Sequence, residues 1–505
     1  MLSVDGVVYE NNIENEIVLV NENSIVILNK SKENYITNDR RIIQILKRAI
    51  SPYIYVISGE KRNNFNYVFK KKWVCEKDNN ERKIRLCSHV IKDGGIYYFI
   101  NAKYRTIDKL SYKSYLAFQE GRLDHKGIEY LLMRHHVEYW KGQKKSIIQI
   151  EPKQGQIEYV YYVFSYACNM NCLYCFEHQN VRQTDFDKNR MQIFLEYIDS
   201  CRLDRKIVIN FYGGEPLLEE NRYEISQLIN QKDKENIYYR IITNGINIKL
   251  FLEEINEIKG KLIEVLITLD GDRNMHNKRR VGKKEEDVYT IILENIKILL
   301  TNNIFVSVRV NVDKNNINCL RGLLDDLILL KGNLLSVILK QVKYTDREKK
   351  DLLELSLYEM YQLKERIKNA YDLNIVLDCL YENRIWELKQ LKQSYLYWDS
   401  CSSCRNGNIS VFDIDGKMYW CNEKMGDRTY LKQDTFVNNI SNNKNVVEIM
   451  HKKCAECDLY NFCGGGCDKE WILYGDGACQ YNDLERILQE EIKKIKEEQI
   501  GEFLL

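Results

Sequence analysis

The sequence lacks several features that would place it in a particular class of protein. No stretch of the 505 residues approaches the ~20 consecutive apolar residues of a transmembrane helix. The first residues have neither the charged nor the apolar region of a secretion signal. The chain also has no excess of one sign of charge, because its 75 Lys and Arg residues nearly balance its 73 Asp and Glu residues. We therefore expect a cytoplasmic protein that needs neither a membrane nor a nucleic acid as partner.

Proline is scarce, with only Pro52, Pro152 and Pro216, whereas cysteine is abundant and clustered. Eight of the 16 cysteines lie between Cys401 and Cys479, far more than an even distribution would place there. Disulfides are disfavoured in a large protein without a secretion signal, so packed cysteines indicate metal or redox sites. Crowded thiolates would repel one another, and a cation removes that repulsion. The sequence therefore predicts a metal centre in its C-terminal part.

The N-terminal third of the chain carries no recognisable chemical motif. Residues 1–85 are expected to form an α+β region of unknown role. Within 86–150, a strand at 95–101 and helices at 111–119 and 125–139 are compatible with a small winged-helix module that recognises a peptide. A plain α+β cap on the enzyme core explains the same pattern equally well.

The central part alternates strands and helices, which indicates an α/β fold with a parallel sheet, either curled into a partial barrel or doubly wound. We expect the partial (β/α)6 barrel. The predicted strands are 157–164, 207–211, 238–242, 263–269, 305–312 and 335–341, and the predicted helices are 187–202, 219–230, 247–258, 286–301 and 315–330. We expect this core over 151–345, a helical connector over 346–397, a cysteine-rich domain over 398–485 and a C-terminal helix over 486–505. Active sites of such barrels lie at the C-terminal ends of the strands.

Three cysteines with the spacing C-x3-C-x2-C directly follow the first predicted strand, at Cys168, Cys172 and Cys175. Three thiolates in one loop can hold three irons of a cubic [4Fe–4S] cluster, which normally takes four cysteines. The fourth iron is then open to a small molecule. A zinc knuckle completed by His178, or incidental cysteines, are the alternatives.

The loop resembles the cluster-binding loop of radical S-adenosylmethionine (radical SAM) enzymes, with the aromatic Tyr174 before the third cysteine. The second strand ends in Gly213-Gly214-Glu215-Pro216, which matches the GGEP motif of that family. The resemblance implies that the backbone and Glu215 grip the methionine amino group of S-adenosylmethionine (SAM). A Gly-Gly turn alone is common, but its place one β/α unit after the cysteines makes the match specific.

Further strand ends fit the same resemblance. The residues that it assigns to the cofactor site are Thr243, Asn244, Thr268, Asp270, Arg309 and Asn311. The family places contacts to the SAM carboxylate and ribose on the fifth strand, which carries Arg309 and Asn311, and its H-x-x-R continuation corresponds to His276 and Arg279 or Arg280. Polar residues at the rim of any barrel are the alternative for Thr243, Asn244, Thr268 and Asn311.

This resemblance implies a definite chemistry. SAM binds the open iron, and an electron from the reduced cluster cleaves its sulfonium to a 5′-deoxyadenosyl radical, which abstracts hydrogen from the substrate. A flavodoxin or ferredoxin is the implied class of electron donor. No side chain stands out as catalytic acid or base.

The C-terminal cysteines resemble a SPASM domain, which holds two auxiliary iron–sulfur clusters. The matching residues are Cys401, Cys404, Cys421, Cys454, Cys457, Cys463, Cys467 and Cys479. By resemblance, Cys401, Cys421 and Cys467 belong to one cluster. Cys454, Cys457, Cys463 and Cys479 belong to the second. Cys404 either completes the first cluster or leaves it with an open iron.

SPASM-containing radical SAM enzymes mostly modify peptides or proteins, which leaves several hypotheses for the substrate. The first is a ribosomally made precursor peptide that receives a thioether or related crosslink, with its leader paired to the strand at 95–101. The second is a sulfatase-like protein whose Ser or Cys becomes formylglycine. A third hypothesis is a non-enzymatic iron–sulfur electron carrier.

Overall fold

The computed structural model describes short strand segments before residue 70 and, with gaps of one to five residues, the ranges 84–139, 157–175, 189–200, 206–378, 409–431 and 454–502. His178, Cys401 and Cys404 lie outside the described residues. The early strands are β1 Val8–Tyr9, β2 Ile17–Val20, β3 Ile25–Leu28, β4 Asn34–Thr37, β5 Ile57–Ser58 and β6 Val68–Phe69. Of these, β1 to β4 form one antiparallel sheet.

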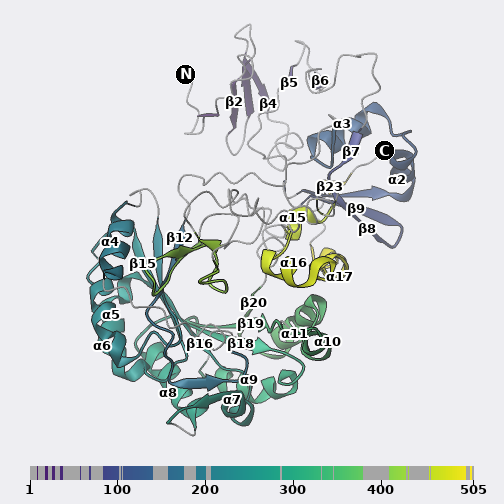
Figure 1. Ribbon diagram of the computed structural model, residues 1–505. Coiled ribbons are helices and arrows are strands. Elements are labelled where there is room, and N and C mark those ends of the chain that lie inside the picture. Colours follow the sequence, from purple (N-terminus) through teal and green to yellow (C-terminus); the bar gives the residue numbers. More distant parts are fainter. Residues whose placement is uncertain are drawn as a thin grey trace.

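A curved sheet forms the centre of the molecule (Figure 1). Among the described residues it has nine strands in the order β20-β19-β18-β16-β15-β14-β12-β21-β22. Their bounds are β12 Glu158–Val163, β14 Ile207–Tyr212, β15 Ile237–Thr243, β16 Leu262–Thr268, β18 Val306–Val312, β19 Leu335–Gln341, β20 Asn374–Leu377, β21 Ile409–Phe412 and β22 Met418–Tyr419. All neighbours are parallel except the β21–β22 hairpin. The predicted (β/α)6 core is confirmed, and each of its six strands ends within one residue of its expected bounds.

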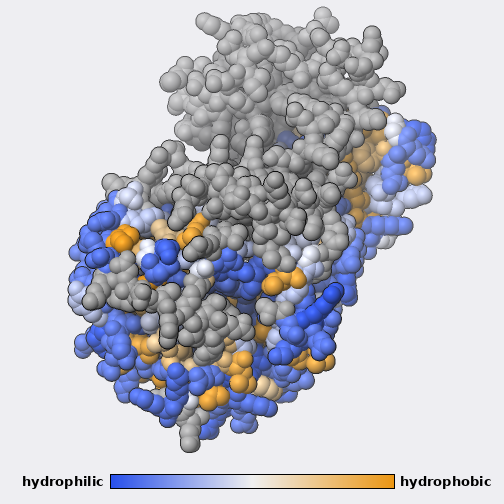
Figure 2. Space-filling view, viewed as in Figure 1, coloured by the Kyte–Doolittle hydropathy of each residue, from blue (hydrophilic) through white to orange (hydrophobic). Residues whose placement is uncertain are grey.

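Helices cover the outer side of this sheet. They are α4 Arg190–Ser200, η2 Glu219–Asn221, α5 Arg222–Ile229, η3 Ile248–Phe251, α6 Leu252–Glu257, η4 Lys259–Lys261, α7 Arg273–Arg279, α8 Val288–Thr301, η5 Ile317–Cys319 and α9 Leu320–Ile328. Their outward surface is mostly hydrophilic (Figure 2). None of the described helices is long and apolar enough to span a bilayer.

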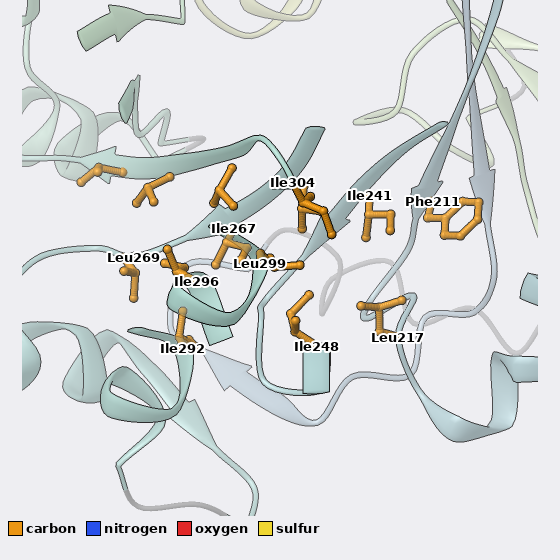
Figure 3. Packing of buried hydrophobic residues seen from close by; sticks show 14 of the residues in the cluster. Phe211, Leu217, Ile241, Ile248, Ile267, Leu269, Ile292, Ile296, Leu299 and Ile304 are labelled. Atoms are coloured by element: carbon orange, nitrogen blue, oxygen red, sulfur yellow. The ribbon is translucent and has the colours of Figure 1, made fainter. Parts of the chain in front are cut away.

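The core lies between sheet and helices because every second strand residue points outward to them. Along β15 the odd-numbered residues are buried and the even-numbered ones only partly covered. Ile241 and Ile267 thus meet Leu217, Ile248 and Ile292 (Figure 3). Each fully buried aliphatic side chain of this kind contributes about 1.5–3 kcal/mol. The barrel is therefore held by apolar packing that does not depend on a metal.

Of the mostly helical connector that we predicted over 346–397, residues 346–378 are described and 379–397 lie outside the described residues. Helices α10 Arg347–Leu353 and α11 Leu357–Ala370 are present, but β20 then pairs in parallel with β19. The β-branched residues Ile375 and Val376 and the alternating burial of β20 favour a strand at this edge. The connector thus extends the barrel sheet.

A second unit, residues 84–139, is the N-terminal sheet module. It contains β7 Ile84–Leu86, β8 His89–Asp93, β9 Ile96–Asn101, β10 Thr106–Ser111, α2 Tyr112–Gln119, α3 His125–Met133 and β11 Val137–Tyr139. The helix that we predicted over 125–139 therefore ends at Met133, and Val137–Tyr139 pairs with β7. A residue with positive φ, His135, follows the helix and turns the chain.

Strand β9 lies in the middle of its sheet, which has the order β23-β10-β9-β8. Both of its edges are hydrogen-bonded, so our hypothesis that the strand at 95–101 receives a leader peptide is wrong. The edge of β10 is paired instead with β23 Gly501–Glu502, in parallel. The C-terminal helix predicted over 486–505 also differs, since α17 Tyr481–Ile492 precedes this strand.

The N-terminal sheet module packs against the C-terminal part of the chain. Ile91, Ile100 and Ile107 share one apolar cluster with α17 and with α15 Tyr460–Cys463. His89 Nδ1 lies 2.8 Å from the Asp458 carboxylate. Helix α16 Asp468–Tyr474 and η7 Gly475–Ala478 lie between α15 and α17 in the sequence. Residues 84–139 and the C-terminal helices α15 and α17 thus pack against each other beside the barrel (Figure 1).

Candidate active site

The three-cysteine loop follows β12 at the C-terminal end of the barrel sheet. Cys168, Cys172 and Cys175 are half-buried, and none of them is in a disulfide. Their loop is supported from one side by the GGEP segment, since Gly214 N–H donates to Ser165 O at 2.9 Å and Glu215 N–H to Ala167 O at 2.9 Å. The two motifs singled out in the sequence therefore touch through their backbones.

Glycine is required at both positions of the Gly-Gly pair. A Cβ on Gly213, whose φ is +130°, would lie 2.4 Å from Ser165 O. One on Gly214 would lie 2.3 Å from Ala167 O. Only glycine permits this backbone approach.

The Glu215 carboxylate holds two strand ends together. Its Oε1 accepts from Thr243 Oγ1 at 2.6 Å and from Leu217 N–H at 2.9 Å, and its Oε2 accepts from Asn244 N–H at 2.7 Å. Burial raises the pKa of Glu215, and these donors act against that shift. The resemblance assigned this side chain to the SAM amino group, but it is buried and turned to the protein. The half-buried backbone of Gly213 and Gly214 is the accessible part of the motif.

Asn244 connects the end of β15 to the cysteine loop. Its Nδ2 donates to Asn169 Oδ1 at 2.6 Å and lies 3.9 Å from Cys168 Sγ. Its Oδ1 accepts from Ile246 N–H at 3.0 Å, which fixes the amide. Asn244 and Thr243 are thus brought to the site as predicted, Thr243 through Glu215.

The opposite side of the loop is paired with the segment that follows α7. Strand β13 Met170–Cys172 runs antiparallel to β17 Arg280–Gly282, with Cys172 opposite Arg280. Leu173 N–H donates to Arg279 O at 3.0 Å, which continues the pairing. The cysteine loop is therefore held between two segments.

Tyr174 is the centre of a buried polar network beneath the loop. Its hydroxyl donates to Asp270 Oδ2 and accepts from Arg280 Nη1 at 2.7 Å and Asn311 Nδ2 at 3.1 Å. Asp270 Oδ1 accepts from Asn311 N–H at 3.0 Å. Burial raises the pKa of Tyr174, so the phenol stays protonated and can donate to Asp270. Three of the predicted residues thus meet around one hydroxyl.

The thiols of Cys168 and Cys172 would be neutral at physiological pH without a cation. Burial raises the pKa of Cys168 to about 12 and also raises the pKa of Cys172, against which the Arg280 guanidinium acts. Metal coordination deprotonates such thiols. Among the described residues, no three Cys, His, Asp or Glu side chains are arranged to share a single metal ion. A [4Fe–4S] cluster binds each thiolate to a different iron, so three half-buried cysteines on one loop fit it.

Arg309 and Thr268 lie farther along the barrel strands. Arg309 Nη2 lies 3.6 Å from Asp378 Oδ2, and Lys340 Nζ lies 3.2 Å from the same oxygen. Thr268 is half-buried at the end of β16. Their assignment to SAM remains a prediction.

Six of the C-terminal cysteines are described. Cys421 and Cys454 are buried, Cys457, Cys463 and Cys467 are half-buried, and Cys479 is exposed. Burial raises the pKa of Cys457 to about 11, and the neighbouring Cys463 and Cys479 add to this. The charge of Lys469 interacts with Cys421 and Cys467.

Two contacts of the loop were missed from the sequence. Asn169 is the polar residue within the cysteine motif that meets Asn244. Arg280 was named only as one of two arginines after His276, and its pairing with Cys172 was not foreseen. The Arg279-Arg280 doublet was the signal, but the H-x-x-R spacing from His276 ends at Arg279, and the pairing of Arg280 depends on the register of β17 against β13.

Comparisons with known proteins agree with this geometry. Residues 162–327 match the Radical SAM superfamily. The chain is 24% identical to the radical SAM cyclopropyl synthase TigE of Paramaledivibacter caminithermalis, over 71% of this chain and 79% of the relative. It is also 24% identical to a cysteine-type anaerobic sulfatase-maturating enzyme of Clostridium novyi, over 59% of this chain and 84% of that enzyme.

Among solved structures, the fold resembles that of anSMEcpe with bound AdoMet and the Cp18Cys peptide. The TM-score is 0.52 at 17% identity, and the match covers 67% of this chain and 98% of that chain. A third of this chain therefore has no counterpart in that structure.

Proposed function

The chain is a radical SAM enzyme, and from this premise we propose that it cleaves SAM reductively and modifies a ribosomally synthesised precursor peptide, most simply by a crosslink such as a thioether. Its family implies a [4Fe–4S] cluster and SAM, and Cys168, Cys172 and Cys175 would hold that cluster. When bound and reduced, the cluster supplies the electron that cleaves the sulfonium bond.

The observation that carries this proposal is the backbone contact between the cysteine loop and Gly213-Gly214. By resemblance to the family, the backbone of this glycine pair would hold the methionine amino group of SAM. Glu215 keeps the motif in place through Thr243 and Asn244, while the buried Tyr174 network fixes the opposite wall. The residues of the chain therefore bind and orient the cofactor and exclude water from its inner side.

A peptide substrate is supported by the relatives and by the extra part of the chain. The similar structure anSMEcpe contains a bound peptide, and this chain exceeds it by a third of its length. Residues 84–139 form a β-sheet with two helices packed on the described C-terminal cysteine region. An extended leader would add to an edge of this sheet, and among the described strands β8 is the edge that pairs on one side only, since β10 is already paired with β23.

Two auxiliary clusters in the C-terminal region belong to the same proposal. The mutual influence of Cys457, Cys463 and Cys479 matches one predicted ligand set, and the position of Lys469 near Cys421 and Cys467 matches the other. If Cys404 is a ligand, both clusters would be closed and would pass electrons; if it is not, the first cluster would keep an open iron that could bind a substrate thiolate.

Formylglycine formation on a sulfatase-like protein is the second candidate. It is favoured by the match to anaerobic sulfatase-maturating enzymes at an identity equal to that with the cyclopropyl synthase. It leaves the N-terminal sheet module without a role. The electron-carrier hypothesis is set aside, because the family match and both relatives are enzymes.

Anaerobic co-expression with small peptides encoded beside the gene, followed by mass spectrometry, tests the proposal. A loss of two hydrogens per modification is the expected result, and the Cys168→Ala, Cys172→Ala, Cys175→Ala triple variant is the control. An aldehyde signature on a sulfatase peptide would favour the second candidate. Deletion of residues 1–142 is expected to abolish leader binding while SAM cleavage persists; unchanged affinity for the leader would contradict the role of the module.

A further inference from the structure

The segment after α7 forms the second wall of the cysteine loop, and no role in the reaction has been assigned to it above. Its strand β17 pairs with β13 in a register that places Arg280 opposite Cys172. Lys283 N–H donates to Asn169 O at 3.0 Å, so the pairing runs along the loop. This wall is built from sequence more than 100 residues away from the cysteines.

Two adjacent arginines of this wall differ in how their charge is balanced. Arg279 Nη1 lies 2.9 and 2.8 Å from the two oxygens of Asp313, a complete ion pair. Arg280 is equally buried, but its nearest carboxylate oxygen, on Asp270, is 4.0 Å away and already accepts from Tyr174. Both guanidiniums keep buried nitrogens without a hydrogen-bond partner among the described residues, Nε and Nη2 on Arg279 and Nε on Arg280, so the two differ in the distance to a carboxylate.

A buried guanidinium without a close carboxylate is costly unless another negative charge compensates it. Beside Arg280, that charge can come from the loop, because Cys172 lies directly opposite Arg280 in the strand pair. Arg280 also donates to Tyr174, two residues from Cys172 and next to Cys175. One side chain therefore contacts the loop and supplies a cation where the thiolates gather.

We propose that Arg280 is a positioning residue for the iron–sulfur cluster: it fixes the loop through Tyr174, and its charge, whose nearest described carboxylate oxygen is 4.0 Å away, favours the reduced state of the cluster. Reduction adds one electron from an external flavodoxin- or ferredoxin-type donor, and the cluster with its thiolates becomes more negative by one charge. A fixed cation beside it favours that form and raises the reduction potential. Arg279, whose charge is neutralised by Asp313, does not have this effect.

The test uses the anaerobically reconstituted full-length enzyme and the variants Arg280→Gln and Arg280→Lys. Arg273→Gln is the matched control, because Arg273 lies on the adjacent helix with an exposed side chain paired to Asp287. The cluster is identified as the one whose electron paramagnetic resonance (EPR) signal changes on addition of SAM. Its midpoint potential and the iron content per chain are measured without any peptide, so the result does not depend on the proposed peptide substrate.

Arg280→Gln is expected to give a more negative midpoint potential than the parent enzyme, while Arg280→Lys and Arg273→Gln stay close to it. If Arg280→Gln fails to retain the cluster, Arg280→Lys must retain more iron than Arg280→Gln. A midpoint potential of Arg280→Gln equal to that of Arg273→Gln would overturn the proposal. Equal loss of iron from Arg280→Gln and Arg280→Lys would also overturn it, because the loss would then depend on the shape of the arginine side chain and not on its charge.

Discussion

The Cys168–Cys175 loop and the C-terminal cysteines differ in what fixes their backbone. The loop lies between the GGEP segment and β17, and both neighbours belong to a barrel with its own apolar core. Around the C-terminal cysteines, the apolar clusters are smaller, and Cys454 and Cys421 are buried members of two of them, whereas Cys168 and Cys172 only pack against the barrel core. A scaffold therefore exists before the metal in the first region, whereas in the second the sulfur atoms are part of the scaffold.

The loss of a cysteine ligand should therefore have a different consequence in each region, on the chemistry in the first and on folding in the second. In the loop, a lost ligand should abolish chemistry and leave the barrel intact. In the C-terminal region, the predicted ligand order interleaves distant cysteines, so a bound metal would tie the domain together and its binding energy would become folding energy. The five predictions that follow test this contrast.

The largest effect is expected from the loop itself. The Cys168→Ala, Cys172→Ala, Cys175→Ala variant should reduce formation of 5′-deoxyadenosine to background. It should keep the circular dichroism spectrum of the parent enzyme, because none of the three cysteines is among the buried residues of the barrel core. Anaerobic assays with chemical reductant measure this. Residual cleavage by the triple variant would show that the cofactor is held elsewhere.

A single C-terminal ligand should act on stability instead. Cys457→Ser is expected to lower the free energy of unfolding by about 2–5 kcal/mol, comparable to the loss of a native disulfide, and to lower the iron content. Thermal unfolding under anaerobic conditions reports it. Cys87→Ser, a half-buried cysteine outside both motifs, is the control; equal losses in the two variants would mean that metal does not stabilise this region.

The glycine pair tests the first wall of the loop. Gly214→Ala places a Cβ 2.3 Å from Ala167 O, a clash that should cost about 1–3 kcal/mol and displace the loop. Gly260→Ala is the matched control, because no atom lies within 4 Å of its Cβ position. Reconstituted iron content and denaturant unfolding are the measurements. If Gly214→Ala bound as much iron as the parent enzyme, the GGEP segment would not be needed to hold the cysteine loop.

Acid should destabilise α7 and the following strand β17, which form the second wall of the cysteine loop. Burial lowers the pKa of His276 to about 3, and its Nδ1 accepts from Asp270 N–H at 3.2 Å. Between that pKa and the unfolded value near 6.5, the unfolded chain binds the extra proton, so stability is lost as pH falls. The loss attributable to His276 from pH 7 to pH 5 is about 2 kcal/mol at most. His276→Asn keeps an acceptor but cannot titrate, and its unfolding free energy should depend less on pH; identical pH profiles would refute this.

The smallest effect is expected where the N-terminal sheet module meets the C-terminal cysteines. Asp458 is about one-third exposed, so the contact with His89 should contribute only about 0.5–1 kcal/mol. A double-mutant cycle with His89→Gln and Asp458→Asn measures it by denaturant unfolding. Fully additive losses would mean that the two side chains do not interact in solution.

The sequence was sufficient for the barrel because its strands and helices repeat with clear periodicity. All six strands were found, whereas β20 and β21 were not, since each is a four-residue strand outside the β/α repeat. The position of β9 was also not accessible, because periodicity predicts a strand but does not say which neighbours pair with it.

At the site, the sequence predicted which residues lie near the loop but not the direction of their side chains. The motif spacing correctly brought Tyr174, Asp270 and Asn311 together, because all lie at or just after strand ends on one side of the barrel. The burial of Glu215 and the different partners of Arg279 and Arg280 depend on packing between distant segments. Two identical residues in sequence can thus have different electrostatic roles.

The central claim is that three thiolates hold a cluster with one iron free for SAM. Mössbauer spectroscopy of the enzyme reconstituted with isotopically enriched iron, recorded with and without SAM, tests it most directly. We expect the signal of a single iron site to change when SAM is added. Spectra that are identical with and without SAM would contradict the account.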